Sequence, residues 1–135
     1  MNTDELKADL YRDEGLRLKP YLDTVGKTTI GVGRNLSDNG ISKLEADQML
    51  EHDIAAVVTE LDLAFPWWTR LPETKRRALA NMAFQLGLPR LKGFEKMLGA
   101  LEAGDWNAAA DEALDSTWAR QVPERAARIA QLFRS

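Results

Sequence analysis

The sequence contains no cysteine and only one histidine, His52. The absence of thiols excludes disulfide bonds, thiolate metal sites and a cysteine nucleophile. Because only one imidazole is available, a multi-histidine metal centre is excluded, and a serine–histidine–aspartate site could be built only on His52. These absences narrow the groups that can carry chemistry in this chain.

Long apolar runs and an excess of basic charge are also missing. No stretch approaches the roughly 18 apolar residues of a membrane span, and Met1–Leu6 holds no apolar run. We therefore expect no signal peptide, no membrane insertion and synthesis in the cytoplasm. The net charge of −3 disfavours nucleic acid as a partner. Acidic side chains dominate residues 37–68 and basic ones residues 69–100, which indicates solvated helix faces or a basic flank for an anionic polymer.

The composition that remains is that of a folded protein. A length of 135 residues with 44 % hydrophobic residues suits one compact domain or two small lobes that share a core. The apolar spacing predicts a mainly helical α+β protein. The expected helices cover residues 3–13, 42–63, 93–103, 105–115 and 123–133, with a further buried helix between Pro72 and Gly87.

Local signals set several of these boundaries. Thr3 can cap the first helix, and Ser42 with Glu45 fits a capping box at the start of the long one. Glycines and β-branched residues between 15 and 35 predict a small antiparallel sheet. The tetrapeptide at 23–26 is expected to be a turn between two strands, and the tetrapeptide at 37–40 a loop.

Two carboxylates and one hydroxyl stand out in the N-terminal part. Leu6, Leu10 and Glu14 share one helix face, so Glu14 ends an apolar stripe and is expected to be partly desolvated. Asp23 lies in the predicted turn, and Thr29 lies on the strand that follows. Glycoside hydrolysis needs one protonated carboxyl as acid and one ionised carboxylate that handles a water or the sugar cation. Glu14 suits the first role, Asp23 the second, and Thr29 could hold the water.

These residues lie within a longer resemblance. The segment Arg12–Gly33 resembles the catalytic segment of the phage T4-type lysozymes, the muramidases of glycoside hydrolase family 24. The resemblance continues through Arg76–Gly87 and Gly93–Phe94. It extends to Trp106, Ala108, Ala109, Trp118, Gln121, Pro123, Arg125, Arg128 and Ile129. The motifs occur in the family's order over nearly the whole chain, and the chain is identified as a member on that basis.

The resemblance implies a lysozyme-like fold with a small antiparallel β lobe and a helical lobe joined by a long helix. The β-containing lobe is expected at about residues 14–41, the interlobe helix at about 42–64 and the helical lobe at about 65–135. The helix over residues 3–13 is expected to pack near the substrate cleft. All of these belong to a single lysozyme-like domain.

The resemblance also implies roles for individual residues. Glu14 matches the proton donor, Asp23 the second carboxylate and Thr29 the threonine beside the catalytic water. Four further residues match the wall of the cleft on the helical lobe and are expected to bind substrate: Phe84, Gln85, Trp118 and Gln121. No metal and no organic cofactor is implied.

Several of these residues have plain structural alternatives. Thr29 taken alone could be only a β-branched strand residue. On pattern alone, Phe84 and Trp118 are core residues. The pair Trp67–Trp68 could stack on sugar rings or pack at a helix junction, and packing is the favoured interpretation.

The chain departs from the family at some cleft positions. Asn35, Met97 and Glu112 stand where the family carries a leucine, a serine and an asparagine, so those sugar contacts are not carried over. Arg34 replaces a histidine. Because Asp53 lies nearby in the family frame, we expect Arg34 to pair with it.

The resemblance implies a phage or prophage endolysin that cleaves the β-1,4 bond between N-acetylmuramic acid and N-acetylglucosamine. Such a protein would act as a monomer on the glycan strand, after release from the host cytoplasm through the inner membrane with a holin. Two alternatives stay open on the same fold. A lytic transglycosylase would form an anhydro-sugar, and a non-catalytic module would only bind glycan.

Overall fold

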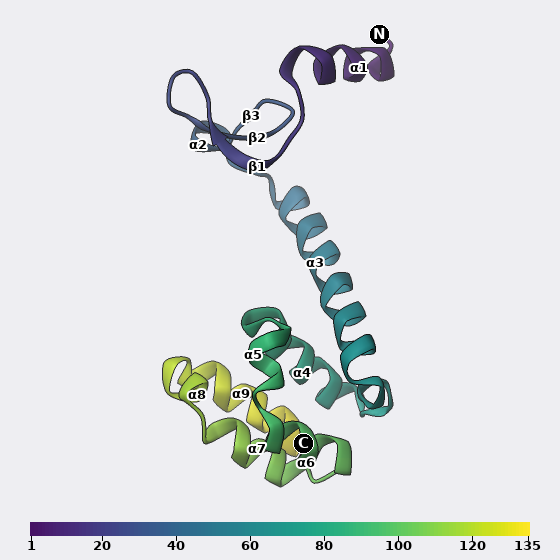
Figure 1. Ribbon diagram of the computed structural model, residues 1–135, viewed down its shortest axis with the longest axis vertical. Helices are drawn as coiled ribbons and strands as arrows, with labels where there is room; N and C mark the ends of the chain where they lie inside the picture. Colours follow the sequence, from purple (N-terminus) through teal and green to yellow (C-terminus); the bar gives the residue numbers. More distant parts are fainter. The chain divides into compact units, whose positions relative to one another are not determined.

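The computed structural model describes every residue from Met1 to Ser135 (Figure 1). The chain divides into two compact units, Met1–Gln48 and Met49–Ser135. It is 72 % helical and contains one three-stranded antiparallel sheet. The predicted mainly helical α+β fold class is confirmed.

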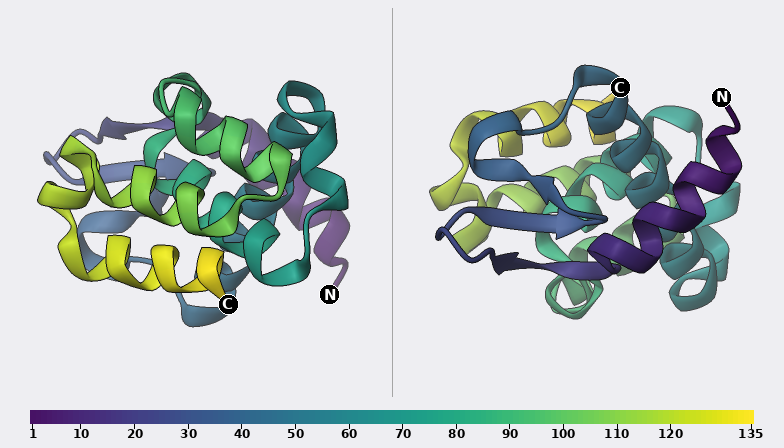
Figure 2. Two further views of the ribbon diagram at one scale, coloured as in Figure 1. Left: turned by 90° about the horizontal axis from the view of Figure 1, so that it is seen from below. Right: turned by 90° about the horizontal axis from the view of Figure 1, so that it is seen from above.

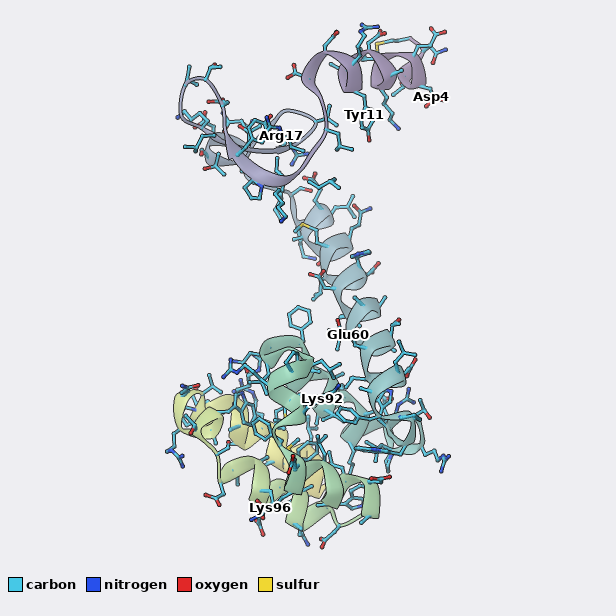
Figure 3. All side chains as sticks on the ribbon, in the orientation of Figure 1. Asp4, Tyr11, Arg17, Glu60, Lys92 and Lys96 are labelled. Atoms are coloured by element: carbon cyan, nitrogen blue, oxygen red, sulfur yellow. The ribbon has the colours of Figure 1, made fainter.

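The first unit begins with helix α1, Thr3–Glu14. Asn2 rather than Thr3 caps it, because the Asn2 Oδ1 atom accepts a hydrogen bond of 3.1 Å from the Glu5 N–H. The helix buries none of its residues, and side chains such as Tyr11 project outwards (Figure 3). Gly15 ends it with a positive φ of 75°.

The predicted sheet is confirmed as strands β1 (Arg17–Leu22), β2 (Thr28–Gly31) and β3 (Arg34–Asn35), in the order β1-β2-β3. Thr29 of the central strand faces Tyr21 of β1 and Asn35 of β3. The register shifts between Arg17 and Tyr21, which marks a bulge in the ladder.

The loop expected at residues 37–40 is instead part of a short helix, α2 (Leu36–Asn39). The reason is a cap: the Oδ1 atom of Asn35 accepts from the Asp38 N–H at 3.0 Å. The long helix α3 follows, Lys43–Ala64. Its capping box is confirmed, since the Ser42 N–H donates to Glu45 Oε1 at 2.9 Å and the Glu45 N–H donates to Ser42 Oγ at 3.1 Å.

The second unit is entirely helical. After η1 (Pro66–Arg70) come α4 (Glu73–Leu86), α5 (Leu88–Lys92), α6 (Glu95–Ala103), α7 (Trp106–Leu114), α8 (Thr117–Gln121) and α9 (Pro123–Arg134). Helix α7 packs against α6 and α9, and α9 also packs against α4 (Figure 2). The short helices α5 and α8 were not among the expected elements.

A continuous apolar core holds this helical unit together. Its largest fully buried side chains are Phe133, Leu61, Leu79, Met82, Leu91, Met97, Leu101 and Ile129. Burying each such side chain contributes about 1.5–3 kcal/mol. The helix expected to be buried nearly all round is α4, but only one of its faces is buried, and Asn81 and Gln85 are exposed. Phe84 on the same helix is 44 % exposed, so its interpretation as a core residue is wrong.

None of the helices combines the length and the apolar character that a membrane crossing requires.

Candidate active site

Glu14 is the last residue of α1, and its carboxylate lies against the turn between β2 and β3. A β-carbon placed on Gly33 would come within 2.9 Å of Glu14 Oε2 and 3.2 Å of its Cδ. Gly33 has a φ of +69°, a conformation that favours glycine. The missing side chain at Gly33 therefore leaves room for the carboxylate. Glu14 was expected to be partly desolvated, but it is exposed, as is every other residue of α1.

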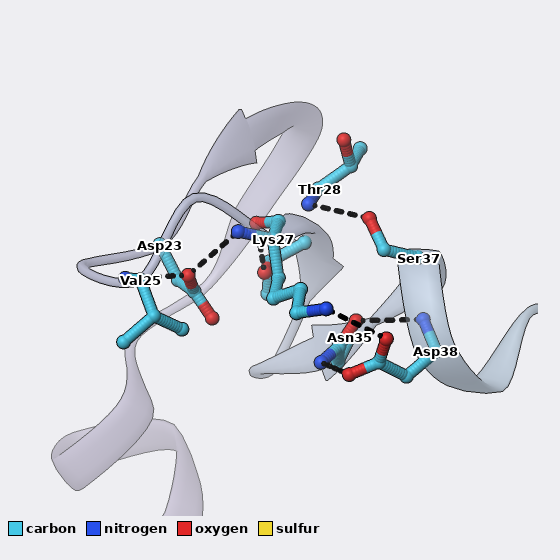
Figure 4. A network of polar contacts seen from close by, with 8 residues as sticks. Asp23, Val25, Lys27, Thr28, Asn35, Ser37 and Asp38 are labelled. Atoms are coloured by element: carbon cyan, nitrogen blue, oxygen red, sulfur yellow. Dashed lines mark hydrogen bonds and ion pairs between the residues drawn. The ribbon is translucent and has the colours of Figure 1, made fainter.

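Asp23 is held in the turn between β1 and β2 by its own side chain (Figure 4). Its Oδ1 atom accepts hydrogen bonds from the backbone N–H groups of Val25 at 2.9 Å and Lys27 at 2.8 Å. The Asp23 N–H also donates to the Lys27 carbonyl at 2.9 Å. Both donors bind Oδ1, and no protein group donates to Oδ2.

Thr29 is the one buried residue of the first unit, 4 % exposed. Its hydroxyl donates to the Lys27 carbonyl at 3.0 Å. Lys27 thus contacts both Asp23 and Thr29: its N–H donates to the Asp23 carboxylate, and its carbonyl accepts from the Thr29 hydroxyl. With its proton committed, the Thr29 hydroxyl can act only as an acceptor toward a further group.

Helix α2 anchors the same turn from the other side (Figure 4). The Lys27 ammonium pairs with Asp38 at 3.1 Å, and the Thr28 N–H donates to the Ser37 hydroxyl at 2.9 Å. Asp38 also accepts from the side-chain amide of Asn35 at 2.9 Å. The amide of Asn35 is thereby committed within the protein.

The predicted pair between Arg34 and Asp53 is wrong, because the guanidinium of Arg34 forms its ion pair with Glu45. Arg34 donates to the two Glu45 oxygens at 3.0 Å and 2.6 Å, the bidentate geometry of a strong charged pair. The hydrogen bonds from Arg34, and then those with Ser42, lower the pKa of Glu45 from 4.5 to about 2, and the pair raises the pKa of Arg34. The start of α3, rather than its middle, therefore binds β3.

The four residues matched to the cleft wall all lie in the second unit, on α4 and α8. Gln85 accepts from the Trp118 indole N–H at 2.9 Å, and this tryptophan is 3 % exposed with its ring edge-on to Phe94. Trp118 is thus confirmed as a core residue whose polar end is satisfied. Phe84 and Gln121 are exposed on the surface of the same unit.

Two of the positions at which the sequence departs from the family, Met97 and Glu112, line a cavity of about 530 Å³ in the second unit. Met97 is 1 % exposed and belongs to the core, while Glu112 is partly buried at the rim. Phe94 and Trp118 are its aromatic lining residues, and charged side chains of both signs also line it.

No group of three or more histidine, cysteine, aspartate or glutamate side chains converges in a way that could hold a metal ion.

Two contacts of this site escaped the sequence interpretation. The sequence predicts that the glycines at 31 and 33 form turns. The close approach of Glu14 to Gly33 is visible only in the folded structure. Glu45 was assigned to the capping box alone, although its carboxylate also binds Arg34. The signal that could have found the second contact is the basic residue directly after a Gly-x-Gly turn.

The small antiparallel sheet and the helical unit are consistent with a lysozyme-like fold. The model of the phage lysozyme family matches residues 11–131, and the chain belongs to that family.

Several relatives are similar to most of this chain. The chain is 34 % identical to the pre-baseplate central spike protein of Enterobacteria phage T4 over 92 % of its own length, although it spans only 26 % of that protein. It is 30 % identical to "Probable T4-type lysozyme 2" of Dictyostelium discoideum, over 95 % of this chain and 92 % of the relative. It is 31 % identical to an endolysin of Acyrthosiphon pisum secondary endosymbiont phage 1, over 76 % of this chain and 70 % of the relative.

Proposed function

We propose that this protein hydrolyses the β-1,4 bond between N-acetylmuramic acid and N-acetylglucosamine in peptidoglycan. The observation that carries the proposal is the grouping of Glu14, Asp23 and Thr29 on one helix end and one hairpin, in a member of the phage lysozyme family. Residues 14–41 form the lobe with the reacting groups, 42–64 the connecting helix and 65–135 the lobe that binds sugars.

In this mechanism Glu14 is the general acid that protonates the oxygen of the leaving sugar. Its carboxylate faces Gly33, where no side chain competes for the space. As the glycosidic bond breaks, positive charge develops on the anomeric carbon, and a water attacks from the opposite face of the ring.

Asp23 and Thr29 are proposed to hold and deprotonate that water. Asp23 uses Oδ1 for the turn, which leaves Oδ2 as the base, while the Thr29 hydroxyl can accept one hydrogen of the water. The backbone of Lys27 bonds to both residues, since its N–H donates to Asp23 and its carbonyl accepts from Thr29. These two bonds fix the spacing between Asp23 and Thr29.

The placement of the two carboxylates favours inversion of configuration. Glu14 touches the Gly33 end of the hairpin and Asp23 lies at its turn end. We therefore propose that the two carboxyl groups are separated by the roughly 6.5–9.5 Å of inverting enzymes rather than the roughly 5–5.5 Å of retaining ones.

We further propose that Phe84, Gln85 and Gln121 bind the glycan strand at their exposed surfaces, with the buried Trp118 supporting Gln85 through its indole N–H. Neither metal nor cofactor is needed. The biological role would be that of an endolysin that acts as a monomer on the host cell wall. It would be made in the cytoplasm and reach the wall with the help of a holin. The name of the endolysin relative supports this role.

A wall-clearing assay tests the catalytic proposal against a binding-only role. Glu14→Gln keeps the size of the side chain and removes its proton, so turbidity loss of purified cell walls should slow by roughly 10²–10⁴-fold or more. Asp13→Asn is the matched control, since Asp13 is an exposed carboxylate one residue earlier on the same helix. The control should clear walls at the wild-type rate. A folded Glu14→Gln protein with near wild-type clearing would refute the assignment.

A further inference from the structure

The four tryptophans fall into two groups by what their indole N–H donates to. Trp68 and Trp118 are 2 % and 3 % exposed, and their N–H groups bond to Asp62 at 2.6 Å and to Gln85 at 2.9 Å. Trp67 and Trp106 are partly exposed, and neither N–H donates to any protein group. Structural packing explains the first pair and leaves the polar ends of the second pair unused.

The two free indoles line one cavity. It has a volume of about 590 Å³ and is formed by η1, the two residues between η1 and α4, the end of α6 and the start of α7. This size lies within the roughly 300–1,000 Å³ of pockets that hold small ligands. Residues far apart in the sequence thus present two aromatic faces to the same space.

Both rings are held in place before any ligand arrives. Trp67 packs on Phe65 with ring centroids 5.6 Å apart. Trp106 lies over the buried Lys75, whose ammonium is 5.4 Å from the ring centroid and also bonds to the backbone oxygen of Ser135. A preorganised aromatic wall loses little conformational entropy on binding.

The charged groups of the cavity indicate a neutral polar ligand. Arg70 and Glu102 both line it, and neither forms an ion pair within the protein. One offers several N–H donors and the other offers acceptors. A single cation and a single anion give no net attraction to a phosphate or to a metal ion, but they can bond the hydroxyls and amides of an uncharged molecule.

We propose that this cavity is a second binding site for the glycan strand, separate from the residues assigned to catalysis. The apolar C–H face of a pyranose ring packs on an indole, while Arg70 and Glu102 bond its hydroxyl or acetamido groups. The inference rests on the proposed function, because that function makes an N-acetylated glycan the polymer at hand. A second contact with the same polymer raises the effective concentration of the glycan at the reacting groups.

Heteronuclear NMR of the indole N–H groups tests the two sites separately. The Glu14→Gln protein, which would not cleave the ligand, is titrated with a soluble β-1,4-linked N-acetylglucosamine hexamer. Each of the four tryptophan signals is assigned with a tryptophan-to-phenylalanine variant. Trp118 is buried, but its N–H donates to the exposed Gln85, so its signal reports on glycan binding at Gln85. Trp67 and Trp106 report on the second cavity.

The signals of Trp67 and Trp106 are expected to shift together and to saturate, while that of the buried Trp68 stays in place. Arg70→Ala should weaken the affinity reported by Trp67 and Trp106 by roughly tenfold, the scale of losing a good polar or stacking contact. It should leave the Trp118 response unchanged. Leu63→Ala is the control for a surface change, since Leu63 is 81 % exposed and lies outside the cavity.

The outcomes separate this proposal from the catalytic one. A shift at Trp118 without any at Trp67 and Trp106 would overturn the second site and leave the catalytic proposal standing. A saturable shift at Trp67 and Trp106 alone would support the second site and count against the glycan-binding role of Gln85. If no tryptophan signal moves, or if Arg70→Ala keeps the full affinity at the second cavity, the second site is wrong, whatever the rate of wall clearing.

Discussion

At the residue scale, the contact between Glu14 and Gly33 is the tightest constraint on the proposed acid. The Glu14 oxygen occupies space that any β-carbon at position 33 would need, since the two would be 2.9 Å apart. Because the side chain of Glu14 is flexible, it would move aside rather than break the fold. The position of the carboxylate, and with it proton donation, is therefore more sensitive to this glycine than stability is.

We predict that Gly33→Ala lowers wall clearing far more than its cost in stability explains. The positive φ of +69° should cost about 1–2 kcal/mol when alanine adopts it. Gly104→Ala is the control, because Gly104 also has a positive φ, of +79°, in the left-handed region, and an added β-carbon there meets nothing within 4 Å. Thermal unfolding should rank the two variants alike while the turbidity assay separates them. Equal clearing by both would remove the link to Glu14.

The Asp23 side chain has two roles that substitutions can separate: it accepts the hydrogen bonds that hold the turn, and it carries a negative charge. An asparagine at this position keeps an oxygen for the N–H groups of Val25 and Lys27 but carries no charge. We predict that Asp23→Asn loses activity with little change in thermal stability. Asp23→Ala should lose activity and also about 1–3 kcal/mol of stability from the unpaired backbone donors. An active Asp23→Asn protein would argue against a base at this position.

At the element scale, the pair between Arg34 and Glu45 ties β3 to the first turn of α3. Both side chains remain more than a third exposed, so the pair is screened by solvent and contributes modestly. Its effect should nevertheless depend on pH. The pKa of Glu45 is lowered from 4.5 to about 2 in the folded protein. Its contribution is therefore complete above about pH 4.5 and is lost as the pH falls toward about 2.

We predict that Glu45→Gln is less stable than wild type near neutral pH and that the difference shrinks between about pH 4.5 and 2. Glutamine can still cap the helix but cannot form the charged pair. Denaturant unfolding of the two proteins over this pH range measures the difference. A stability gap that stays constant down to pH 2 would show that the charge of Glu45 does not matter.

The sequence was informative about elements wherever a local signal decides the structure. The capping box at Ser42 and the glycine that ends α4 act over a few residues, and they set those boundaries correctly. The helices α2, α5 and α8 were missed, because each has at most five residues. Such helices are too short to show a period and depend on caps and packing.

At the scale of the whole molecule, the resemblance carried more of the proposed site than the residue pattern did. Glu14 and Asp23 are nine positions apart, and nothing in that spacing shows which face of the sheet they share. The long-range contacts could not be predicted at all: Gln85 meets Trp118 and Glu14 meets Gly33 only because the fold brings them together. The partner of Arg34 was misassigned for the same reason: the start of α3 was predicted, but the packing of its first turn against β3 was not.

The anomer released first from a defined peptidoglycan oligosaccharide tests the central proposal most directly. Proton NMR during the earliest phase of the reaction, before mutarotation, distinguishes α- from β-reducing ends. If Glu14 protonates the leaving oxygen while Asp23 and Thr29 direct a water to the opposite face, the β-linked substrate should first give the α-anomer, and the Glu14→Gln protein should give none. Initial release of the β-anomer, or a product without a reducing end, would contradict hydrolysis by this arrangement.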